Sequence, residues 1–332
     1  MDIRNRKELC EFAGRRLEDN QPVKKISVIF ASVVIGLSIV SALVNYVLGL
    51  QIDQSGGLSK MGLRSTLSAL QTMLPLVQSA VLMCVELGYS AAMLRTARGQ
   101  YVSPQTLRLG FDRFWVLLRY TLVEGLLLTT LAFGAAYLGM MIFLATPLSG
   151  QTMELLVPLL QGTSVLNNAV SIPDGIYQQV VQSITPAYVI CGILFCVGAA
   201  PVVYALRMCS YVIIEKPGFG AMAAIRESRK MMRGNRLHLF KLDLRLWWFY
   251  LASGVASVVC YGDQILPLLG VELPLSQDAS FFLFYGLYWI AQFAIFVFLL
   301  PRVEIPYALA YDAIRPKEQP AGGVVLGNIF QM

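Results

Sequence analysis

The fold is decided by long uncharged stretches such as ISVIFASVVIGLSIVSALVNYVLGL, which occupies residues 26–50 directly after the basic pair Lys24 and Lys25. An α-helix of roughly 20 mostly apolar residues crosses the hydrocarbon core of a bilayer, where lipid offers no partner to an unpaired backbone group. Five further runs along the chain are similarly long and mostly apolar. We therefore predict an all-α, polytopic membrane helical bundle of about six transmembrane helices. Its spans are expected at approximately 26–50, 66–94, 114–146, 180–214, 242–262 and 279–310.

The composition agrees with lipid as the solvent of this chain. Hydrophobic residues make up 56% of the sequence and charged residues only 14%, whereas soluble domains have about 25% charged residues. The single histidine, His238, excludes a metal site built from several histidines, and the 6 cysteines lack CxxC spacing. We therefore expect neither a metal site nor a cofactor.

The distribution of lysine and arginine predicts the orientation, because cytoplasmic loops are enriched in these residues. With six spans, all but two of the 26 basic residues fall on one side of the membrane, and only Lys60 and Arg64 fall on the other. The N- and C-termini are therefore predicted to be cytoplasmic. We expect a single membrane domain at residues 1–314, followed by a flexible cytoplasmic tail at residues 315–332.

A short cytoplasmic segment with an amphipathic pattern precedes each odd-numbered span. The first segment carries Leu9, Ala13 and Leu17 on one helical stripe, the second covers residues 104–113, and the third covers residues 219–231. This pattern predicts three hairpins, each introduced by an amphipathic helix, and indicates an internal repeat. The alternative is that any amphipathic helix followed by a hairpin has this appearance.

Several short motifs carry a resemblance to a known family. They are Gly88-Tyr89-Ser90, Leu109-Gly110-Phe111, Ala224-Ile225-Arg226-Glu227-Ser228, Met231-Met232-Arg233-Gly234-Asn235 and Pro306-Tyr307. Over residues 4–311 the chain resembles a bacterial integral-membrane family known as domain-of-unknown-function family 975. The resemblance implies a multi-pass protein of the bacterial cytoplasmic membrane and supplies no catalytic residues. The outer loop at residues 147–179 is longer than the resemblance leads us to expect.

Ionisable residues inside the predicted spans are the best indication of a functional site. A lone charge at the bilayer centre costs at least ~2.5–3.5 kcal/mol, so such residues usually pair or face water. The candidates are Glu86, Arg119, Glu124, Arg207, Asp243, Arg245, Arg302 and Glu304. They could form an ion-pair lattice that locks the bundle, or a cytoplasm-facing polar cavity that binds a headgroup, a peptide or a small ion. A catalytic carboxylate pair is a third interpretation.

These observations favour a non-enzymatic membrane protein that binds or transports a lipid-like or peptide ligand, or that serves as the membrane subunit of a complex. The alternative is a membrane-embedded enzyme that acts on lipid headgroups from the cytoplasmic side. The expected partners are membrane lipids, whose anionic headgroups would contact the basic cytoplasmic face, and a protein partner if the chain is a subunit. Nucleic acid is not expected, because no aromatic or groove-fitting module accompanies the basic residues.

Overall fold

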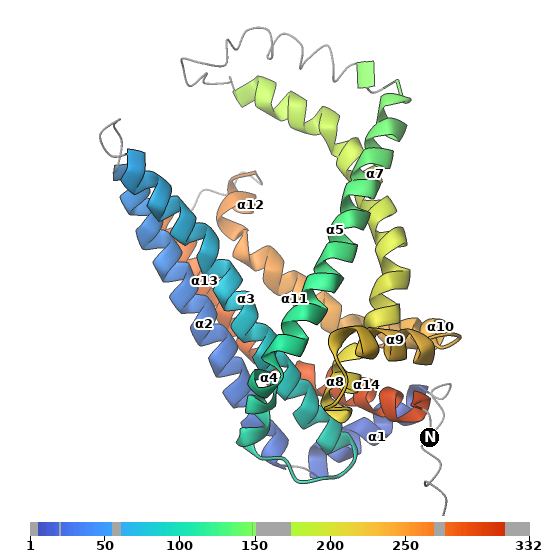
Figure 1. The fold of residues 1–332 in the computed structure, drawn as a ribbon. Helices are drawn as coiled ribbons and strands as arrows, with labels where there is room; N and C mark the ends of the chain where they lie inside the picture. The colour runs from blue at the N-terminus through green and yellow to red at the C-terminus, as the bar shows by residue number, and fades with distance from the viewer. Residues whose placement is uncertain are drawn as a thin grey trace, which may run out of the picture. The chain divides into compact units, whose positions relative to one another are not determined.

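The computed structural model describes residues 6–19, 21–54, 61–147, 149–150, 174–268 and 276–315, and within these ranges every regular element is a helix (Figure 1). Most of the predicted outer loop and of the predicted tail lies outside the described residues. The chain divides into two compact units, Met1–Leu118 with Met208–Met332, and Arg119–Arg207. The expectation of a single domain at residues 1–314 stays a prediction.

The first unit begins with three helices, α1 (Arg6–Asp19), α2 (Gln21–Gln54) and α3 (Met61–Ala97). α1 buries Leu9 and Ala13, which lie one turn apart, and it packs against α14. α2 and α3 pack side by side (Figure 1). The rings of Phe30 and Tyr89 stack between them with centroids 4.3 Å apart. The short helices η2 (Pro104–Arg108) and α4 (Leu109–Asp112) follow α3 and return along it.

The second part of this unit starts with four short helices, α8 (Cys209–Glu215), α9 (Ala221–Met231), α10 (Arg236–Arg245) and α11 (Trp247–Cys260). α12 (Gly262–Leu268) leads toward a long uninterrupted helical segment made of α13 (Gln277–Ala294), η3 (Ile295–Leu299) and α14 (Leu300–Ile314). η3 is a π-helical turn that ends two residues before Pro301, whose nitrogen cannot donate to the preceding turn. The long segment packs against α2 and α3, and α11 packs against α13.

The second unit is built from most of α5 (Phe114–Leu144) and from α7 (Asp174–Leu206). The two helices approach closely at Gly139, where an added Cβ would lie 3.0 Å from the Cα of Cys191. The Cys191 thiol also donates to the carbonyl of Ala136 at 3.7 Å. A small residue at this crossing therefore lets the two backbones pack directly.

Five segments of the described chain are long and apolar enough to cross a bilayer. They are Pro22–Ile52, Gly62–Ala97, Phe114–Leu144, Ser183–Glu215 and Ala279–Ile314. They overlap the first, second, third, fourth and sixth predicted spans, so the prediction of a helical fold with several segments able to span a membrane is confirmed for the described residues. Their apolar surfaces suit lipid contact, since Leu122, Leu126 and Phe133 of α5 are 64%, 69% and 74% exposed.

The fifth predicted span, at residues 242–262, differs from the others. The helix is interrupted at Leu246 and again at Tyr261, which leaves α11 with 14 residues. Such a helix is about 21 Å long, shorter than a hydrocarbon core of about 30 Å. The count of six crossings therefore stays a prediction.

Two glycines allow α3 to pack closely against the η2–α4 segment. An added Cβ at Gly88 would lie 2.6 Å from the Cα of Leu107, and one at Gly110 would lie 2.6 Å from the carbonyl carbon of Cys84. Both obstacles are backbone atoms, which cannot rotate away as a side chain can. Only glycine fits at these two positions without moving a helix.

We predict that Gly110→Ala destabilises the protein by about 1–3 kcal/mol or more, because the new methyl group forces α4 away from α3. The measurement is the free energy of unfolding in mixed detergent micelles titrated with SDS. Gly36→Ala in α2 is the matched control, since an added Cβ there meets nothing within 4 Å. Equal stability of the two variants would contradict the close packing.

Candidate functional site

A cluster of charged residues joins the ends of three helices in the first unit. Arg98, just after α3, donates from Nη2 to Asp312 Oδ1 at 2.6 Å and from Nε to Asp312 Oδ2 at 3.0 Å. The same Nη2 also donates to Oε1 of Glu215, the last residue of α8, at 2.7 Å. Arg315 pairs with Glu215, and Tyr311 donates to Glu215 Oε2 at 2.6 Å. We call Arg98, Glu215, Tyr311, Asp312 and Arg315 the Arg98 cluster.

The Arg98 cluster is electrically balanced, with two guanidinium groups facing two carboxylates. The side chains of Arg98, Glu215 and Asp312 are only 20–26% exposed, so water screens these ion pairs weakly. The hydrogen bonds to Asp312, and then those to Glu215, raise the pKa of Arg98 above its usual value. A permanently charged arginine that is bonded through Nε and Nη2 to two carboxylates suits a structural clamp between α3, α8 and α14 better than proton transfer.

A chain of tyrosines connects this cluster to a carboxylate within the spans. The rings of Tyr211 and Tyr311 stack with centroids 5.3 Å apart, and the Tyr211 hydroxyl donates to Glu304 Oε2 at 3.1 Å. On α3, Glu86 is exposed and lies close enough to Glu304 for the two carboxylates to interact electrostatically. Two acidic groups from different helices thus share one polar region, which we call the Glu86–Glu304 site.

A second tyrosine connection runs from α14 to α10. The Tyr250 hydroxyl lies 3.1 Å from Asp243 Oδ1 and 3.3 Å from the Tyr307 hydroxyl. Arg245, next to Asp243, lies beside the Cys10 thiol of α1. Burial raises the pKa of Cys10 in spite of this arginine, so the thiol stays protonated at neutral pH and is a poor nucleophile.

The structure distributes the eight predicted site residues over both units. Five belong to the first unit, namely Glu86, Asp243, Arg245, Arg302 and Glu304, and three belong to the second, namely Arg119, Glu124 and Arg207. Glu86 and Glu304 lie in one polar region, and tyrosines join Asp243 to α14. Arg302 is exposed on α14, and Glu124 is half-buried on α5. That all eight form one cavity or one ion-pair lattice stays a prediction.

Sequence reasoning missed the Arg98 cluster, because it considered only charges inside the spans. Arg98, Glu215 and Arg315 each lie within one or two residues of a helix end. One signal was present, since Asp312 and Arg315 are spaced i, i+3 and also form an ion pair at 3.6 Å. Among the described residues, no group of three or more His, Cys, Asp or Glu side chains is placed to hold a metal ion.

Several long apolar helices, joined by polar contacts at their ends, define an all-helical integral membrane protein. The sequence profile of the family described as "Protein of unknown function (DUF975)" matches residues 5–318, so the chain belongs to this family. The resemblance carried by the glycine-containing motifs is thereby confirmed, whereas a bacterial origin stays a prediction. Searches of the curated proteins and of the solved structures found no match.

We predict that Arg98 and Asp312 are energetically coupled by about 1–3 kcal/mol, since their bonds are charge-assisted, bidentate and partly buried. The measurement is a double-mutant cycle of Arg98→Gln and Asp312→Asn on the free energy of unfolding in mixed micelles. The matched pair is Lys7 and Glu11, which are 3.9 Å apart with side chains 74% and 53% exposed. Its coupling should stay below about 0.5 kcal/mol. Equal coupling energies in the two cycles would contradict the proposal that Arg98 holds the three helices together.

Proposed function

We propose that the chain crosses the cytoplasmic membrane six times, as three hairpins each introduced by an amphipathic helix, with both termini in the cytoplasm. Five crossings correspond to the five long apolar segments. The remaining crossing is the fifth along the chain. It would use α11 extended by α12 and the end of α10, which together are long enough to pass the hydrocarbon core. The near absence of lysine and arginine from the predicted outer side supports this orientation.

Two similar turns support the repeat. Gly99 after Arg98 has a φ of 71°, and Gly234 after Arg233 has a φ of 87°. Both turns follow a helix that ends two or three residues earlier, α3 in one case and α9 in the other. A shared Arg-Gly turn in the left-handed region is a specific similarity, because few residues other than glycine adopt it.

Fusions to alkaline phosphatase, which is active only outside the cytoplasm, test the crossings. We predict inactive fusions after Arg245 and after Ile314, and an active fusion after Leu268, because α11 and α12 would carry the chain outward. Green fluorescent protein fused at the same positions should give the opposite pattern. An inactive phosphatase after Leu268 would reduce the count to five.

Within this placement, we propose a non-enzymatic protein that binds a lipid-like or peptide ligand from the cytoplasmic side. The observation that carries the proposal is the Glu86–Glu304 site, where an exposed carboxylate within one long apolar helix lies close enough to a carboxylate of another to interact with it electrostatically. Acidic residues in spans are costly and usually face a polar cavity or a partner. The Tyr211 hydroxyl donates to Glu304 at 3.1 Å. Tyr89 is also close enough to Glu304 to interact with it electrostatically, and its hydroxyl lies 3.2 Å from the Ser27 hydroxyl.

The chemistry of this site favours a ligand group that donates hydrogen bonds or carries positive charge. Two carboxylates accept hydrogen bonds, and they repel each other unless a proton or a cation lies between them. An amine of a lipid headgroup or of a peptide has both properties. Either ligand would also place its apolar part against the exposed aliphatic residues of the spans.

We predict that Glu86→Gln and Glu304→Gln each weaken retention of a co-purifying ligand by at least about tenfold, because each removes a charge-assisted hydrogen bond. The measurement is native mass spectrometry of the protein released from its own membrane. Glu18→Gln is the control, since Glu18 is exposed on α1.

Unchanged ligand in both span variants would contradict the binding site. A stoichiometric protein partner in place of a small ligand would instead identify the chain as a subunit of a complex. Turnover of lipid by the purified protein, abolished by Glu86→Gln, would favour the alternative of an enzyme acting on headgroups.

A further inference from the structure

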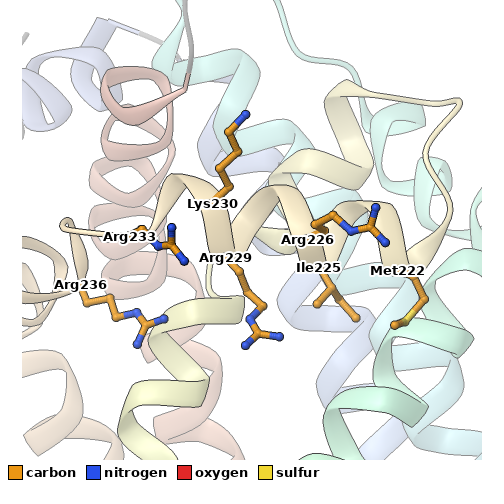
Figure 2. Close-up of a pocket in the computed structure, with 7 residues that line it drawn as sticks. All are labelled: Met222, Ile225, Arg226, Arg229, Lys230, Arg233 and Arg236. Atoms are coloured by element: carbon orange, nitrogen blue, oxygen red, sulfur yellow. The ribbon is translucent and has the colours of Figure 1, made fainter.

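The connection between α8 and α11 carries a dense group of cations. Arg226, Arg229 and Arg233 follow one another at spacings of three and four residues, which places them along one side of α9 and its following turn. Lys230 and Arg236 complete the group, and all five side chains are exposed (Figure 2). The opposite side of α9 is buried through Ala224 and Ser228. We call the five cations the α9 basic surface.

This surface is hollowed. A depression of about 490 Å³ is lined by the five cations together with Met222 and Ile225 (Figure 2). A second hollow of about 430 Å³ adjoins it at Arg233, Gly234, Arg236 and Leu237. The hollows are large enough for a phosphate group and the glycerol attached to it.

The turn after α9 adds a helix N-terminus to the same place. Gly234, with a φ of 87°, reverses the chain so that α10 begins at Arg236, beside the hollow. Asn235 precedes α10, but its side chain does not cap the helix and instead donates to the carbonyl of Met231 at 2.9 Å. The first amide groups of a helix favour an anion, and here they reinforce the surrounding arginines.

Within the described part of the chain, acidic side chains do not neutralise the positive charge of this surface. Across the residues that the structure describes, none of the five cations forms an ion pair with a carboxylate. The acid on α9 itself, Glu227, pairs instead with Lys216 at 3.6 Å. Cations this close together repel one another, so binding of an anion is favoured.

We propose that the α9 basic surface binds the phosphate of an anionic phospholipid whose headgroup lacks an amine. This inference rests on the membrane placement in the proposed function, which keeps residues 216–241 at the cytoplasmic surface between the span ending at Glu215 and the crossing that contains α11. A basic cluster on a helix next to a span is typical of anionic lipid binding. Arginine pairs suit phosphate oxygens because the guanidinium fork binds two of them at once.

Exposed apolar residues beside the cations favour a lipid over soluble phosphate. Met222 lies at one end of the larger hollow and is 61% exposed, and Leu237 lines the smaller one and is 70% exposed. Phe240, one turn further along α10, is 44% exposed. These side chains would contact the acyl chains while the arginines hold the phosphate.

The test is native mass spectrometry of the delipidated, full-length protein in detergent with equimolar phosphatidylglycerol and phosphatidylcholine. We expect the wild type to retain phosphatidylglycerol selectively, and Arg229→Gln/Arg233→Gln to bind it at least about tenfold more weakly, because two phosphate contacts are lost. Arg108→Gln/Lys25→Gln is the matched control, since it removes two exposed charges from the same predicted side. Its affinity should change by less than about twofold.

Three results would overturn the proposal. They are equal losses in the two double variants, equal retention of both lipids by the wild type, and displacement of the lipid by millimolar inorganic phosphate, which would indicate a soluble anion. Thermal unfolding of each variant in detergent checks folding, and Arg229→Lys, which keeps the charge but not the fork, should have an intermediate affinity.

The outcome is separable from that of the proposed function. Glu86→Gln should leave phosphatidylglycerol binding unchanged, whereas the arginine variants should leave the ligand of the Glu86–Glu304 site unchanged. An active phosphatase fusion after Arg245 would place the surface outside the cytoplasm and overturn the placement itself.

Discussion

Lipid offers no hydrogen-bond partner to a peptide group, and the arrangement of the helices in this protein follows from that constraint. α2 and α5 run without an interior break through segments that lipid would surround, so the peptide groups between their ends are bonded inside their own helix, and in α3 Pro75 removes one such bond. The helices deviate from regular α-helical hydrogen bonding where the chain is packed against other protein groups. The π-helical turn at Ile295–Leu299 packs against α2, and the interruption at Leu246 lies at a buried residue.

The same constraint explains why polar side chains collect at helix ends. Arg98, Glu215 and Asp312 come from three helices and satisfy one another, so that none of these charges is left alone near the membrane. Direct backbone packing at Gly88 and Gly110 holds α3 against the next segment without requiring large side chains. Together these contacts hold the helix ends of the first unit in place, because hydrophobic burial alone is a weak force between helices in lipid.

The helical class and the long apolar segments could be predicted from the sequence, because the length of an apolar run and the thickness of a bilayer are enough to identify a candidate span. Five predicted spans overlap the five long apolar helical segments, and the family motifs around Gly110 and Gly234 mark turns or close contacts that require glycine. The interruption at Leu246 could not be predicted, since no proline or glycine marks it.

The site was less predictable than the fold. Depth along a helix identified Glu86 and Glu304 as candidates, but it could not show that Arg98 would face Asp312. That contact joins residues 214 positions apart, and it depends on how three helices pack. Charges at helix ends usually set orientation or contact headgroups, so a sequence gives little reason to select one of them as a partner.

The Arg98 cluster and the α9 basic surface are connected through neighbouring residues at the end of α8. Glu215 is held by Arg98, and the next residue, Lys216, pairs with Glu227 on α9. The α9 basic surface is therefore anchored to the same clamp that fixes α14, which carries Glu304. A basic surface held in place before its ligand arrives loses less conformational entropy on binding than a mobile basic loop. This anchoring argues that α9 presents its cations as a built site, whereas a flexible loop would contribute only a diffuse positive charge.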